Sequence, residues 1–90
     1  MAKIDSALAK ALENDLFGRH GPILGGDDLQ AALGYPSREA FRQALFRDAV
    51  PVPVFSLPRR RGKFALVKDV ASWLAHCHAQ AQRSRKDSTK

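Results

Sequence analysis

Apolar residues recur every four positions near the start of the chain, which places them on one face of a helix. These residues are Ile4, Leu8, Leu12 and Leu16. The pattern predicts a helix from about Ser6 to Phe17, which Gly18 is expected to end. The next stretch, GRHGPILGG, is rich in glycine and is interrupted by a proline, so it is predicted to be a loop.

Two short helices are predicted after this loop, with a tight turn between them. In GGDDLQAALG, Leu29 and Leu33 share a helical face, the acidic residues suit the positive end of the helix dipole, and Gly34 ends the helix. Ser37 is then placed to cap a third helix, REAFRQALFRDA. One face of this third helix carries Phe41, Ala44, Leu45 and Asp48.

A basic hairpin is predicted next. Pro51 and Pro53 prevent the third helix from continuing and restrict a strand that contains them to the edge of a sheet. Two apolar runs, Val52 to Leu57 and Phe64 to Val67, flank a turn, which predicts a hairpin with a loop of about five or six residues. The positive charges of the turn are those of Arg59, Arg60, Arg61 and Lys63.

A final helix is predicted to close the domain, with Asp69 as its cap and Trp73 as its main core anchor. Its inward face is expected to carry Val70, Trp73, Leu74 and Cys77. From Arg83 onward, RSRKDSTK has no apolar residue, so residues 83–90 are predicted to form a flexible basic tail.

The positive charge is concentrated in the middle and at the end of the chain. Of the net charge of +6, residues 1–37 contribute −2, residues 38–63 contribute +5, residues 64–82 contribute none and residues 83–90 contribute +3. This distribution is typical of a protein that lays one face on a polyanion such as nucleic acid. The alternative is that the surplus charge only aids solubility.

Length and composition exclude several classes of protein. A chain of 90 residues that is 44% hydrophobic and 27% charged is sufficient for one globular domain. It contains no apolar run long enough to span a membrane and no signal peptide, so a cytoplasmic location is expected. Cys77 is the only cysteine, which excludes an internal disulfide and a cysteine-rich zinc site.

Neither a metal site nor an active site is predicted, and no cofactor is expected. His76 and His78 flank Cys77, but residues two apart on a helix point in nearly opposite directions and cannot readily bind one ion. Cys77 and His76 likewise diverge as a nucleophile and base, and no oxyanion donor is indicated. We therefore do not expect an enzyme.

The two short helices and the hairpin match the order of a winged helix-turn-helix, in which the second helix enters the DNA major groove. The basic hairpin would then be a wing that meets phosphates or an adjacent minor groove. The alternatives are two ordinary packed helices and a solvated basic loop. The predicted fold class is mainly α with a small β-hairpin, comprising four helices and a two-stranded wing.

A helical wheel turns five side chains of the third helix away from the core: Glu39, Arg42, Gln43, Phe46 and Arg47. Arg42 and Gln43 are the main candidates for reading bases, because arginine pairs with guanine and glutamine with adenine. Ser37 and Arg38 are better placed for phosphate. Glu39 either accepts a hydrogen bond from cytosine or pairs with Arg42 or Gln43. The predicted DNA-binding residues are Ser37, Arg38, Glu39, Arg42, Gln43, Arg47, Arg59, Arg60, Arg61 and Lys63.

Residues 24–75 resemble the winged-helix module of the MerR, excisionase and AlpA-like regulators. The resemblance is carried by the LGYPS turn, the PVPV entry to the wing, the basic hairpin and the DVASWL helix. It implies a small DNA-binding regulator of transcription or recombination. The expected organisation is one domain over residues 1–82, with an additional N-terminal helix at 5–17 and a core module at 24–80.

Two copies on a symmetric DNA site are expected, because one such module makes few phosphate contacts. The N-terminal helix is the expected interface, although its apolar stripe could equally pack into its own domain. The leading functional hypothesis is a repressor of a phage, plasmid or other mobile element. The alternatives are an excisionase-like architectural factor and an adaptor or antitoxin that binds a partner protein through the N-terminal helix or the basic tail.

Overall fold

The computed structural model describes residues 6–88, with side chains described for residues 7–82. Its elements are α1 (Ser6–His20), β1 (Ile23–Gly25), α2 (Gly26–Leu33), α3 (Arg38–Phe46), β2 (Phe64–Leu66) and α4 (Val67–Ser88). The described chain is therefore mainly helical, with four helices and a two-stranded antiparallel sheet. This confirms the predicted fold class and is compatible with a winged-helix description.

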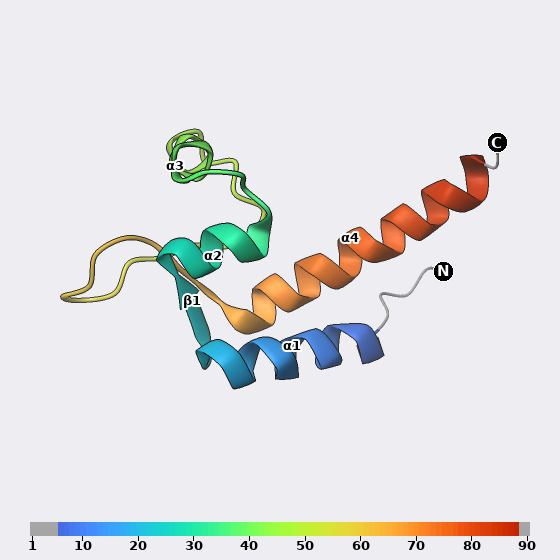
Figure 1. Ribbon diagram of the computed structural model, residues 1–90, viewed down its shortest axis with the longest axis horizontal. Coiled ribbons are helices and arrows are strands. Elements are labelled where there is room, and N and C mark those ends of the chain that lie inside the picture. The colour runs from blue at the N-terminus through green and yellow to red at the C-terminus, as the bar shows by residue number, and fades with distance from the viewer. Residues whose placement is uncertain (1–5, 89–90) are drawn as a thin grey trace.

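The elements form two groups around the sheet (Figure 1). The helices α1 and α4 lie along each other on one side, while α2 packs near the sheet and α3 lies beyond α2, away from α1. The segment between α3 and β2 projects as a loop at one end of the molecule. The arrangement thus leaves α3 and this loop free of the α1 and α4 pair.

The core of the described chain is apolar. Its residues come from every described element except α1, which contributes the partly buried Leu16. The residues that are almost fully buried are Leu24, Leu29, Val67, Val70, Ala65, Ala71 and Ala75. Among the described side chains, no polar or charged residue is buried. Hydrophobic burial therefore fixes the position of α2, on which α3 is mounted.

Helix α1 is three residues longer than predicted. It passes through Gly18 and ends at His20, after which Gly21 adopts a positive φ of 83° and its N–H donates to the Phe17 carbonyl at 2.8 Å. One glycine costs a helix only about 1 kcal/mol relative to alanine, which does not stop it. Gly21, in the left-handed conformation, ends α1 instead.

The apolar stripe of α1 packs within its own chain, which is one of the two alternatives that the sequence left open. Leu8, Leu12 and Leu16 are each half-buried, and α1 packs along α4. Ile4, the first residue of the stripe, lies outside the described residues.

The predicted loop after α1 contains the strand β1. It pairs antiparallel with β2 in the register Ile23 to Leu66, Leu24 to Ala65 and Gly25 to Phe64. Gly25 is required at this position, because a Cβ there would overlap the ring of Phe64. The loop prediction was wrong because the strand is only three residues long and its partner is distant in the sequence.

The projecting loop is held at its base by Phe55 and Phe64. The N–H of Phe55 donates to the Phe64 carbonyl at 2.9 Å, and the N–H of Phe64 donates to the Phe55 carbonyl at 2.8 Å. This pair is an isolated bridge, so the predicted first strand from Val52 to Leu57 does not form. The nearby prolines lack the N–H groups that a longer ladder needs. Residues 56–63 form the loop beyond the bridge.

Two predicted helix boundaries differ in the structure. Helix α3 ends at Phe46, and Asp48 adopts a positive φ of 55° and is exposed, so its predicted place on the inward face is wrong. Helix α4 begins at Val67, directly after β2, where the Val67 N–H donates to the Pro22 carbonyl at 2.9 Å. Asp69 therefore lies in the first turn of α4 and does not cap it.

The inward face of α4 differs in part from the prediction. Val70 is fully buried and Trp73 only half-buried, while the small residues Ala71 and Ala75 lie in the core. Cys77 is exposed, so its predicted inward orientation is wrong. The backbone continues as helix to Ser88, through most of the segment predicted to be a flexible tail. No helix in the described part of the chain is long and apolar enough to cross a membrane.

Candidate nucleic-acid interface

The turn between α2 and α3 is fixed by local hydrogen bonds. Gly34 takes the left-handed conformation with φ of 85°, and its N–H donates to the Ala31 carbonyl at 3.0 Å. Gln30 closes the turn twice: its carbonyl accepts from the Tyr35 N–H at 3.1 Å, and its Nε2 donates to the Tyr35 carbonyl at 3.2 Å. These hydrogen bonds fix the backbone of the turn between the two helices.

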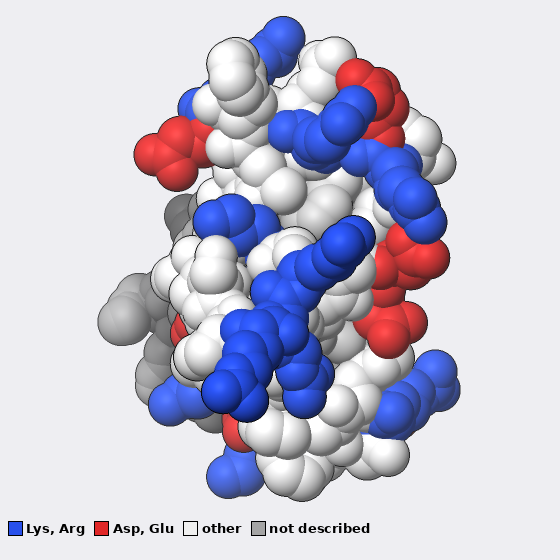
Figure 2. Space-filling model, turned by 90° about the vertical axis from the view of Figure 1, so that its left-hand side faces the viewer, with Lys and Arg blue, Asp and Glu red and all other residues white. Residues whose placement is uncertain are grey.

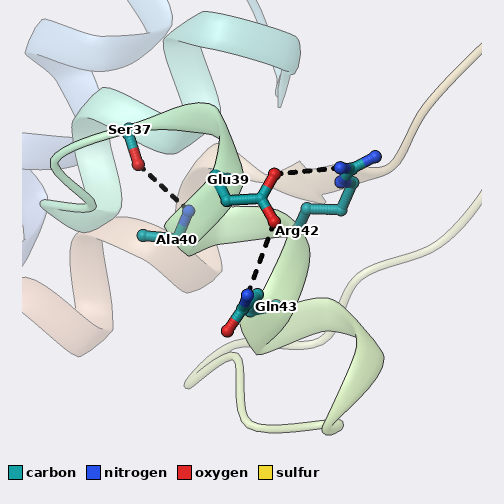
Figure 3. A network of polar contacts seen from close by, with 5 residues as sticks. All are labelled: Ser37, Glu39, Ala40, Arg42 and Gln43. Atoms are coloured by element: carbon teal, nitrogen blue, oxygen red, sulfur yellow. Dashed lines mark hydrogen bonds and ion pairs between the residues drawn. The ribbon is translucent and has the colours of Figure 1, made fainter.

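Ser37 caps α3, as the sequence predicted. Its backbone is extended, and its Oγ accepts a hydrogen bond from the Ala40 N–H at 3.1 Å (Figure 3). Phe41 anchors the other side of the helix in the core, where its ring lies 5.4 Å from the ring of Tyr35. Cap and anchor together hold α3 with its opposite face outward.

The outward face of α3 carries the residues that the helical wheel placed there. All five are exposed: Glu39, Arg42, Gln43, Phe46 and Arg47. Ser37 and Arg38 are also exposed at the start of the helix. The predicted orientation of these side chains is confirmed, because Phe41 is buried and Leu45 half-buried on the other side.

Glu39 bonds to both predicted base-reading residues. Its Oε1 accepts from Arg42 Nη2 at 2.9 Å, and its Oε2 accepts from Gln43 Nε2 at 3.4 Å (Figure 3). Pairing along the helix surface was one of the two roles that the sequence left open for Glu39. The carboxylate holds the guanidinium and the amide on one surface, with several of their donors still available.

Arg38 links the start of α3 to the start of α2. Its Nε lies 3.4 Å from Asp27 Oδ1, and both side chains are largely exposed. An exposed ion pair contributes only about 0 to 1 kcal/mol to stability. Arg38 can therefore exchange this carboxylate for another anion at little cost. The sequence analysis did not find this pair, because its residues lie on different helices.

The tip of the projecting loop is strongly basic. Arg59, Arg60, Arg61 and Lys63 are all exposed, and the loop turns through positive φ values at Arg59 (63°) and Gly62 (86°). The Arg60 N–H donates to the Leu57 carbonyl at 3.1 Å, and Lys63 Nζ donates to Ser56 Oγ at 3.2 Å. Among the described side chains of residues 7–82, none of the three arginines takes part in an ion pair.

The loop and α3 face the same side of the molecule. Figure 2 shows the side on which the loop projects, where Lys and Arg side chains form a band across the middle and further ones lie above it. A single shallow groove joins the two elements, with Arg38, Glu39 and Arg42 from α3 and Gly62 and Lys63 from the loop in its lining. Gln43, Phe46 and Arg47 lie outside this groove and line an adjoining hollow on α3 with Glu39 and Arg42. The groove, this hollow and the loop tip are together called the basic face below. Asp27 and Glu39 place two carboxylates in it.

The histidines and the cysteine lie apart from this surface or make local contacts only, as far as the described side chains show. His20 Nδ1 lies 3.5 Å from Asp28 Oδ2, and His76 Nε2 lies 3.3 Å from Gln80 Nε2. Within the described residues, no cluster of His, Cys, Asp or Glu side chains could hold a metal ion. The lone thiol of Cys77 is exposed on α4.

Comparisons with protein-family models, with curated proteins and with solved structures found no match to this chain.

Proposed function

We propose that this protein binds double-stranded DNA in a sequence-specific manner through the basic face and represses transcription. The observation that carries the proposal is the groove shared by α3 and the basic loop. A helix in the major groove and a loop over the adjacent backbone need to be presented on one side of the protein. The resemblance to MerR, excisionase and AlpA-like regulators supports the same function.

In the proposed complex, α3 lies in the major groove, which is about 12 Å wide and accommodates one helix. Arg42 and Gln43 read base edges, with Glu39 holding them in place. Ser37 and Arg38 bind phosphate beside the free N–H groups of the first helical turn. Arg47 extends the contacts at the other end of α3.

The loop supplies contacts outside the groove that α3 occupies. Arg59, Arg60 and Arg61 have no acidic partner among the described side chains, and arginine is favoured both at phosphates and in a narrow minor groove. Lys63, at the base of the loop, lines the groove that the loop shares with α3. It is therefore placed to bind the phosphates between α3 and the loop.

In the proposed complex, two copies of the protein bind one symmetric DNA site in the cytoplasm. One module offers few phosphate contacts, and a dimer doubles them. We propose that it regulates genes of a phage, plasmid or other mobile element, because regulators of the families that residues 24–75 resemble act there.

Selection of bound sequences from a random duplex pool tests this function. A sequence-specific protein enriches one motif, and a symmetric dimer enriches a palindrome. The variant Arg60→Ala/Arg61→Ala should then weaken binding and reduce the slope of log K against log salt by about 1.8 for each bound subunit, which is about 3.6 for a dimer, since each lost phosphate contact removes about 0.9. It leaves Arg59, with its positive φ, unchanged.

The matched control is Lys10→Ala/Arg19→Ala, which removes the same charge from exposed positions of α1. It should leave the slope nearly unchanged. Equal losses in both variants, or a pool from which no motif is enriched, would contradict the proposal.

A further inference from the structure

Phe46 is the most exposed large hydrophobic side chain among the described residues. It is 91% exposed at the last position of α3, whereas Phe17 on α1 is 53% exposed. An aromatic side chain offers a large apolar area, and leaving it in water forgoes the free energy of burying it. A partner surface that covers Phe46 would therefore gain affinity.

The position of Phe46 on α3 indicates which surface this is. It follows Gln43 by three residues, Arg42 by four and Glu39 by seven, so these four side chains form one stripe. With Arg47 they line one shallow hollow on the outward face of the helix. Phe46 thus shares this hollow with two arginines, of which Arg42 is paired with Glu39, and these surroundings suit an anionic partner better than an apolar protein surface.

We infer that Phe46 contacts the C5-methyl group of a thymine in the major groove and makes the protein prefer that base. The inference rests on the proposed function. Thymine presents its methyl group in the major groove, where it is the apolar element that side chains such as phenylalanine contact. Phe46 is a specificity-determining residue in this account, beside the hydrogen-bonding pair Arg42 and Gln43.

The helix geometry places this contact near the bases read by Gln43. Three residues advance along the helix axis by about 4.5 Å, while stacked base pairs are about 3.4 Å apart. The thymine should therefore lie in a base pair next to the one that Gln43 reads. Insertion of the ring between bases is excluded, because such wedges act from the minor groove, about 6 Å wide, and α3 does not fit there.

Replacement of thymine by deoxyuridine tests the contact directly, because it removes only the methyl group. The full chain is used to select a duplex, and each thymine of the selected site is then replaced in turn. At one thymine position in each half-site, the replacement should lower the affinity of the wild-type protein about fourfold, which is the factor expected for one buried methyl group. In Phe46→Ala the same replacement should have no effect. Phe17→Ala, which removes an exposed phenylalanine from α1, should keep the fourfold loss.

The outcomes separate this inference from the proposed function. If the protein selects a motif but no thymine position is sensitive to deoxyuridine, the inference is wrong and the proposed function stands. The inference is also wrong, and the proposed function stands, if the sensitivity to deoxyuridine persists in Phe46→Ala. If no duplex is bound, both fail. Thermal melts followed by circular dichroism should show that both phenylalanine variants remain folded, since neither ring belongs to the core.

Discussion

Glu39 and Arg42 form an ion pair of 2.9 Å on the outward face of α3. The same carboxylate accepts a hydrogen bond from Gln43, so one acidic residue contacts both proposed base readers. It holds the two side chains in position before any DNA arrives, which reduces the entropy lost on binding. It also brings a negative charge towards the phosphates.

These two effects predict that Glu39→Gln raises the overall affinity for DNA but lowers the sequence specificity. Loss of the charge should raise affinity for random duplex about two- to fivefold, the range for one exposed charge interaction. Looser positioning of Arg42 and Gln43 should lower the ratio of specific to random binding. Fluorescence anisotropy with a selected and a scrambled duplex measures both quantities. Asp15→Asn, which removes an exposed charge from α1, is the control, and an equal change in the ratio there would count against a positioning role.

Different substitutions of Ser37 should change the stability of the fold and the affinity for DNA independently. Ser37→Ala removes the acceptor of the Ala40 N–H and should lower the free energy of unfolding by about 1 kcal/mol in a urea melt. Ser37→Asp keeps an acceptor and should retain the stability, but its charge should weaken duplex binding severalfold. Ser37→Asn, which caps without a charge, is the matched control. Normal duplex affinity in Ser37→Asp would argue against phosphate at the start of α3.

Two glycines should respond in opposite directions to the same substitution. Gly25→Ala places a Cβ against the ring of Phe64 and should destabilise the fold by about 1 to 3 kcal/mol, the usual cost of overpacking. Gly18→Ala lies inside α1 with open space around it and should stabilise the fold by up to about 1 kcal/mol. Chemical denaturation compares the two. A neutral Gly25→Ala would contradict the β1 and β2 register.

Elements with local signals were predicted well from the sequence. The span of α2, its end at Gly34 and the cap at Ser37 depend on residues within a few positions of each other. The outward orientation of Arg42 and Gln43 follows from the same helical period. These features include most of the candidate site on α3.

The missed features depend on contacts between distant segments. The strand β1 forms because β2 lies beside it, and its own three residues carry no strand signal. Cys77 was expected to face inward on helical spacing alone, but it is exposed because the buried contacts of α4 are made earlier in that helix. The Arg38 and Asp27 pair likewise needs the angle between α2 and α3, which the sequence does not give.

Titration of the isotope-labelled protein with a selected duplex, followed by NMR of backbone amides, tests most directly whether α3 and the basic loop bind one DNA. The account predicts that the amides of residues 37–47 and of residues 56–63 other than Pro58 shift together with a single dissociation constant, while those of α1 shift little. Shifts confined to α1 and α4, or saturation of α3 and the loop at different duplex concentrations, would contradict it.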